Sequence, residues 1–124
     1  MKKWFISFII AILPLAASAV EFEKDGLWYS IDETAPVSTA TVISSQGDAY
    51  TGDIVIPSAV EYEGVTYDVT AIGENAFQEC SSITTVTIGE KITSIGVSAF
   101  WGCWNLEKVI VTNLSNWCSI SFDN

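Results

Sequence analysis

The 124-residue sequence contains no histidine. It therefore has no imidazole base to activate a serine or cysteine nucleophile, and no histidine metal ligand. The cysteines, at positions 80, 103 and 118, are too few and too far apart for a zinc site. No glycine-rich phosphate-binding loop is present, and the segment from Asp48 to Asp53 lacks the alternating ligands of a calcium loop. We expect no enzymatic activity, no catalytic residue, no cofactor and no bound metal.

A hydrophobic run long enough to cross a membrane is also missing. The apolar stretch from Trp4 to Leu13 is too short to span about 30 Å of hydrocarbon as a helix. Basic residues Lys2 and Lys3 precede it, and an A-x-A cleavage site, Ala17-Ser18-Ala19, follows. This order is typical of a secretory signal peptide over residues 1–19. We expect export by the Sec route, an extracellular or cell-surface location, and no membrane insertion after cleavage.

Basic residues are scarce: the chain has 5 Lys and Arg against 15 Asp and Glu. Removal of Lys2 and Lys3 with the signal peptide lowers the net charge from −10 to −12 (−10 − 2). Such a surface repels nucleic-acid phosphates and anionic lipid headgroups, so we expect neither as a partner.

One 23-residue unit is written twice between Ile72 and Val111. The period is the same for every matched pair, as in Ile72 and Ile95 (95 − 72) or Cys80 and Cys103 (103 − 80). The other matches are Gly73/Gly96, Ala76/Ala99, Phe77/Phe100, Ile83/Leu106, Val86/Val109 and Ile88/Val111. A fixed period in the twenties indicates a solenoid, in which each coil buries its apolar face against the next.

Each unit predicts one short strand and one short helix. Val86-Thr87-Ile88 alternates apolar and polar residues, as a strand with one inward face does, and Val109-Ile110-Val111 follows the same pattern. Ala99, Phe100 and Cys103 fall at helical spacing. Strands of successive coils are then parallel neighbours about 4.8 Å apart. The fold class is a β-rich α/β solenoid of 23-residue coils.

Residues 71–88 and 94–111 resemble repeats of the BspA-like leucine-rich repeat proteins, the Treponema and Bacteroidetes type. Both copies carry the pattern I-G-x-x-A-F-x-x-C-x-x-[LI]-x-x-[VI] in register. The resemblance implies a bacterial, extracellular solenoid used for adhesion or protein binding. It implies no catalytic residues.

The segment before the repeats predicts an N-terminal β cap over residues 20–52, followed by a solenoid over 53–124. Asp25-Gly26 between apolar arms indicates a β-hairpin, which would cover the open end of the first coil. A second hairpin, inserted at about 61–69, forms around Glu63-Gly64. Insertions of this kind are frequent binding elements, so Tyr62 and Tyr67 are candidate binding residues; alternatively, the hairpin only thickens the cap.

Trp101 and Trp104 are the other candidates for a binding surface. They replace Gln78 and Ser81 of the preceding unit, which are polar and so predict a solvent-facing position. Exposed tryptophans side by side are typical of interaction sites. The alternative is that a following coil or the segment around Trp117 covers them.

Cys80 and Cys103 occupy equivalent positions of adjacent coils. An exported protein can form a disulfide there, but the inward positions favour two buried free thiols.

After Val111 the period fails, and the sequence predicts an incomplete last coil. Residues 113–124 resemble a variant coil of the same family, which implies a short Leu…Trp-Cys helix in place of the usual one. Ile120 and Phe122 then lack a covering coil, which favours self-association through the uncapped C-terminal coil, or a frayed end. Two functions remain open. One is a secreted or cell-surface binding or adhesion module for an extracellular protein or glycan. The other is a structural spacer or fragment of a larger surface protein with no binding activity of its own.

Overall fold

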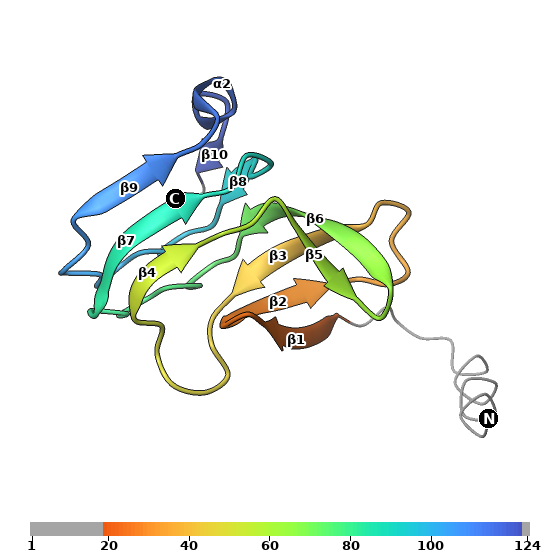
Figure 1. Cartoon of the computed structure of the whole chain (residues 1–124), viewed down its shortest axis with the longest axis horizontal. Coiled ribbons are helices and arrows are strands. Elements are labelled where there is room, and N and C mark those ends of the chain that lie inside the picture. The colour runs from red at the N-terminus through yellow and green to blue at the C-terminus, as the bar shows by residue number, and fades with distance from the viewer. Residues whose placement is uncertain (1–18, 123–124) are drawn as a thin grey trace.

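The computed structural model describes residues 19–122, so the predicted signal peptide, apart from Ala19, lies outside the described residues. The described chain is almost entirely short strands joined by turns (Figure 1). The strands are β1 (Val20–Lys24), β2 (Leu27–Ile31), β3 (Thr39–Ile43), β4 (Gly52–Val55), β5 (Ala59–Tyr62), β6 (Val65–Ile72), β7 (Ile83–Ile88), β8 (Ser94–Ile95), β9 (Lys108–Val111) and β10 (Ser121–Phe122). One helix, α2 (Leu114–Trp117), lies where the family resemblance implies a Leu…Trp-Cys helix.

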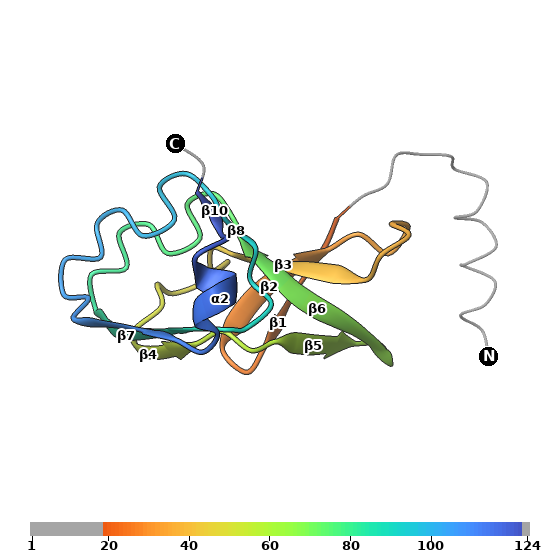
Figure 2. The same cartoon turned by 90° about the horizontal axis from the view of Figure 1, so that it is seen from above.

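The strands form two sheets. A three-stranded parallel sheet has the order β4-β7-β9, and a seven-stranded sheet has the order β1-β2-β3-β6-β8-β10 with β5 paired to β6. Seen from above, the two sheets diverge from each other, and the turns between them close the third side of the coils (Figure 2). The core lies inside this enclosure, because the inward residues of both sheets alternate with exposed ones.

Residues equated by the repeat lie opposite each other in the sheets. Val86 pairs with Val109 across β7 and β9, and Ile72 pairs with Ile95 across β6 and β8. Both pairs are separated by 23 residues (109 − 86 and 95 − 72). The parallel strands expected from the sequence are therefore present, and they stack equivalent side chains on one another.

The two helices predicted within the repeat are not formed, and this prediction is wrong. Residues 74–79 and 97–102 are consecutive turns. Asn75, Glu79 and Ser98 have φ near +57°, in the left-handed region that interrupts an α-helix. As a result, backbone N–H groups in these turns point toward the next coil and bond to its carbonyls. The Phe77 N–H, for example, donates to the Ala99 carbonyl at 2.7 Å. Hydrogen bonding between coils thus replaces hydrogen bonding along a helix.

Gly96 is required by close approach between coils. A Cβ at this position would lie 2.6 Å from the backbone nitrogen of Glu74, and no side chain fits there. Its own N–H donates to the Ile72 carbonyl at 2.8 Å. Contact with the preceding coil is therefore the reason for glycine at this position.

Both hairpins have two-residue turns with left-handed backbone. Asp25 and Gly26 join β1 to β2 with φ of 50° and 88°, and Glu63 and Gly64 join β5 to β6 with φ of 47° and 85°. Two positive φ values match the right-handed twist of the strands they connect. Asp-Gly is a strong signal for such a turn, and both hairpins lie where the sequence predicts them.

All three cysteines are free, as the buried-thiol alternative predicts for Cys80 and Cys103. Cys80 is buried, Cys103 is half-buried and Cys118 is exposed. The Cys103 thiol donates to the Phe77 carbonyl at 3.1 Å. Burial raises the pKa of the Cys80 and Cys103 thiols, which keeps both in the protonated, weakly reactive form.

The C-terminal end of the solenoid is only partly covered. Val109 is 46% exposed, whereas Val86, its equivalent on β7, is fully buried. Helix α2 covers one part of this end, because the Asn116 side chain donates to the Glu90 and Ile92 carbonyls. Apolar groups of the last coil outside that contact remain open to solvent among the described residues.

Because Phe77 is covered by a neighbouring coil and Phe100 is less so, substitution of the two equivalent residues is expected to reduce stability by different amounts. Phe77 is fully buried and stacks on the half-buried Phe100, with ring centroids 5.2 Å apart. Phe77→Ala is expected to lower the free energy of unfolding by about 3–5 kcal/mol. Phe100→Ala is expected to lower it clearly less, because that ring already contacts water. Urea unfolding of both variants measures the difference, and equal losses would contradict the open end.

Thiol titration checks the three cysteine environments. In the native protein, Cys118 is expected to react rapidly with a thiol reagent, while Cys80 and Cys103 react slowly because they are shielded and protonated. In denaturant all three are expected to react. A single reactive thiol under those conditions would instead indicate a Cys80–Cys103 disulfide.

Candidate interaction surface

Trp101 and Trp104 form an exposed aromatic pair on the turn side of the last full coil. They are 54% and 76% exposed, and their ring centroids lie 6.0 Å apart in an edge-to-face arrangement. The solvent-facing position predicted from Gln78 and Ser81 is confirmed. The alternative of a cover from the Trp117 segment is wrong, because both indoles stay exposed with that segment in place. Trp117 instead packs against Phe122, with ring centroids 5.8 Å apart.

The preceding coil fixes the backbone beneath this pair. The Trp101 carbonyl accepts a hydrogen bond from Glu79 N–H at 2.6 Å. Gly102 follows with φ of 84°, and a Cβ there would come within 2.9 Å of the Glu79 Cα. The turn is therefore held tightly against its neighbour while both indoles project outward. A rigid platform of this kind loses little conformational entropy when it binds a partner.

Tyr67 does not belong to any exposed surface, which corrects its prediction as a binding residue. It is only 5% exposed and lies opposite buried Val60 in the β5–β6 hairpin. Strand alternation from Tyr67 to Val69 places both residues on the inner face. The Glu63-Gly64 turn fixes the register of the hairpin, and in this register the Tyr67 side chain points inward.

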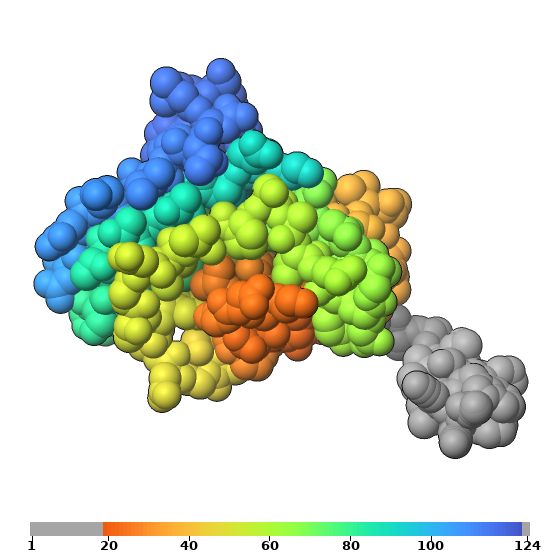
Figure 3. Space-filling view, in the orientation of Figure 1, coloured from red at the N-terminus to blue at the C-terminus, as the bar shows by residue number. Residues whose placement is uncertain are grey.

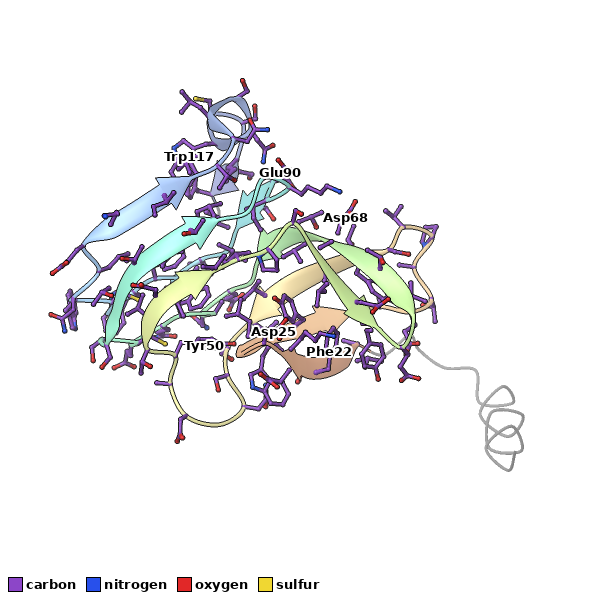
Figure 4. The ribbon with its side chains drawn as sticks, viewed as in Figure 1. Phe22, Asp25, Tyr50, Asp68, Glu90 and Trp117 are labelled. Atoms are coloured by element: carbon purple, nitrogen blue, oxygen red, sulfur yellow. The ribbon has the colours of Figure 1, made fainter. Side chains whose placement is uncertain are left out.

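Tyr62 is half-buried and lies at the end of β5. Its ring packs on Phe22 of β1, with centroids 4.5 Å apart, and Phe22 in turn stacks on Tyr29 at 5.6 Å. Phe22 is marked in Figure 4. The contact joins the two hairpins, so most of the Tyr62 ring is engaged within the protein rather than presented to a partner.

The outer face of the β4-β7-β9 sheet carries apolar residues that sequence reasoning missed. Val55 is 62% exposed and Ile110 is 41% exposed, with Thr85 and Thr87 on the strand between them. Val55 and Ile110 occupy the outward positions of strands whose alternate residues are also apolar. The sequence pattern alone therefore does not separate the outer face of this sheet from its core face.

Within residues 19–122, no three potential metal ligands gather closely enough to hold an ion. In the same range, no helix has the length and apolar character needed to cross a bilayer.

Comparisons with known proteins agree with this architecture. The sequence model of the BspA type leucine rich repeat region (6 copies) matches residues 56–124. A leucine-rich repeat protein from Bacteroides capillosus is 32% identical, with a TM-score of 0.63 over 73% of this chain and 64% of its own. One from Bacteroides ovatus is also 32% identical, with a TM-score of 0.63 over 71% of this chain and 22% of its own.

A leucine rich cell surface protein from Faecalibacterium prausnitzii is 25% identical, with a TM-score of 0.62 over 77% of this chain and 24% of its own. The chain thus spans less than two thirds of the length of each of these relatives. A comparison with curated proteins gives no match.

The matched region covers more than half of the chain, and it contains the paired strands β6–β8 and β7–β9 that stack equivalent residues. The chain therefore belongs to the BspA-type leucine-rich repeat family.

Proposed function

We propose that this protein is a secreted or cell-surface interaction module that binds an extracellular partner without catalysing a reaction. The exposed Trp101–Trp104 pair carries the proposal. Two large indoles held in water by a rigid turn are costly unless they meet a partner. Tryptophan is also enriched among the residues that dominate binding energy.

Family membership supports a protein-interaction role. A protein surface is the partner that the geometry favours, because an edge-to-face indole pair offers an irregular apolar relief rather than one flat face. A glycan is the alternative partner, since a sugar ring stacks on a single exposed indole. Export by the Sec route remains part of the proposal, and the basic start and A-x-A site of residues 1–19 support it.

We also propose that the 23-residue coil is the repeating unit of the solenoid and that the β1–β2 hairpin caps its first coil. The separation of Val86 and Val109 in adjacent strands supports the first point. The second is supported by the position of β3 between that hairpin and β6, which continues the sheet outward from the coils.

A second candidate is self-association through the C-terminal end, or service as a spacer within a longer surface protein. Val109 and Phe122 favour self-association, because they are 46% and 52% exposed on β9 and β10, which are edge strands of the two sheets. Strand edges with apolar neighbours pair readily with another chain.

The double substitution Trp101→Gln, Trp104→Ser tests the proposed function by restoring the residues of the preceding coil. The melting temperature is expected to stay close to that of the wild type, since exposed substitutions usually change stability by about 0.5 kcal/mol or less. Binding to a partner found on arrays of extracellular proteins and glycans is expected to fall at least about tenfold.

The matched control is Gln78→Ala, Ser81→Ala, which alters equivalent exposed positions one coil earlier and should leave binding unchanged. Sedimentation of each variant distinguishes partner binding from self-association. Undiminished binding by a folded double-tryptophan variant would refute the role of this surface.

A further inference from the structure

The outer edge of β4 is unpaired. Strand β4 bonds to β7 on one side, where Gly52 N–H donates to the Ser82 carbonyl and Ile56 N–H to the Thr87 carbonyl, both at 2.9 Å. Backbone groups alternate in direction along a strand, so those of Asp53 and Val55 point away from β7. No strand occupies that side among residues 19–122. The edge therefore offers ladder positions to an added strand.

A groove runs along this free edge. It consists of two adjoining cavities of about 390 and 290 Å³, which share Asp25, Leu27 and Val55 in their linings. No residue of β7 lines either cavity, so both lie on the unpaired side of β4. Figure 3 shows the hollow between the yellow segment that leads into β4 and the orange β1–β2 hairpin. We call it the β4 groove.

The far walls of the β4 groove are held in place. The Tyr50 hydroxyl accepts from Trp28 N–H at 2.9 Å and donates to the Ile43 carbonyl at 2.8 Å. Burial raises the pKa of Tyr50 to about 12, so the phenol stays protonated and both bonds persist at neutral pH. Asp25 and Tyr50, both marked in Figure 4, thus stand on walls that are tied to each other. The groove is preformed rather than created by a loop movement.

The charge of the β4 groove is strongly negative. Five carboxylates and one ammonium group line it: Glu23, Asp25, Asp48, Asp53, Glu61 and Lys24. These carboxylates do not form a metal-binding cluster in the described part of the chain. Their spread along the groove matches several separate positive charges on an elongated partner better than one ion. Between them, Leu27, Trp28 and Val55 supply apolar surface.

We propose that the β4 groove binds an extended polypeptide segment bearing lysine or arginine, which pairs as an additional strand with the free edge of β4. Main-chain bonds to Asp53 and Val55 would supply affinity, as in other cases of strand addition. Alternate side chains of the segment would face the carboxylates and the exposed Val55, which gives selectivity for basic, β-forming sequences. This site is separate from the Trp101–Trp104 pair and does not depend on the function proposed for it.

Titration with a short synthetic peptide of alternating lysine and valine tests the proposal. The peptide is expected to bind wild-type protein and to slow hydrogen exchange at the amides of Asp53 and Val55. A peptide with alternating glutamate and valine is expected not to bind. A lysine–valine peptide with N-methylated backbone amides keeps its charge and side chains but loses its backbone donors, and it is expected to bind at least about tenfold more weakly.

Variants of the protein separate charge from strand pairing. Asp25→Asn with Asp48→Asn is expected to weaken binding by about threefold to tenfold and to reduce its salt dependence. Asparagine is well accepted at the left-handed Asp25 position, so the turn is retained. Glu74→Gln neutralises an exposed carboxylate outside the groove, and Trp101→Gln, Trp104→Ser alters the other surface. Both are expected to bind the peptide normally.

Four outcomes would overturn the proposal. The first is absence of binding. The second is equal binding of the N-methylated peptide, which would mean charge attraction without strand pairing. The third is equal competition by a free polyamine with no protection of the β4 amides. The fourth is concentration-dependent protection of those amides without peptide, which would indicate that a second copy of the chain occupies the edge.

Discussion

Stacking of equivalent apolar side chains in adjacent coils is the interaction on which this structure depends. Phe77 lies flat against Phe100, with an interplanar angle of 9°, and Val86 lies beside Val109. A single coil is too thin to enclose its own core, so each coil is stable only where a neighbour covers it. The glycines at coil contacts follow from this requirement, because a side chain at Gly96 would force the coils apart.

The same requirement leaves edges that a compact domain would close. Parallel strands stacked coil on coil produce a sheet with two open sides, one along β4 and one along β9. The two sides differ in their surroundings. The β4 side faces fixed walls and carboxylates, whereas the β9 side carries apolar residues and is partly covered by α2. Open edges are therefore inherent in the fold, and local residues determine what each can accept.

Sequence periodicity predicts those parts of the structure that depend on local patterns. The pairing of residues 23 positions apart, the two hairpin turns and the exposure of Trp101 all follow from spacing and turn chemistry. The prediction of helices in the repeat is wrong because Ala99, Phe100 and Cys103 can point inward with the same spacing in a helix and in a run of turns. Left-handed residues such as Ser98, which decide between the two, carry no clear signal. The prediction of Tyr67 as an exposed binding residue is wrong, because the direction of its side chain depends on the register of the hairpin.

The β4 groove lies beyond sequence reasoning for a different reason. Its walls come from residues 23–29 and 45–61, and the chain of pairings from β2 through β3 to β6 brings them together. All of its residues precede the 23-residue unit that is written twice between Ile72 and Val111, so that period does not mark the groove. In a solenoid the repeat specifies the scaffold and must be preserved from coil to coil. Residues free to specify a partner are then those that break the repeat, such as Trp101 in place of Gln78, and those before it begins.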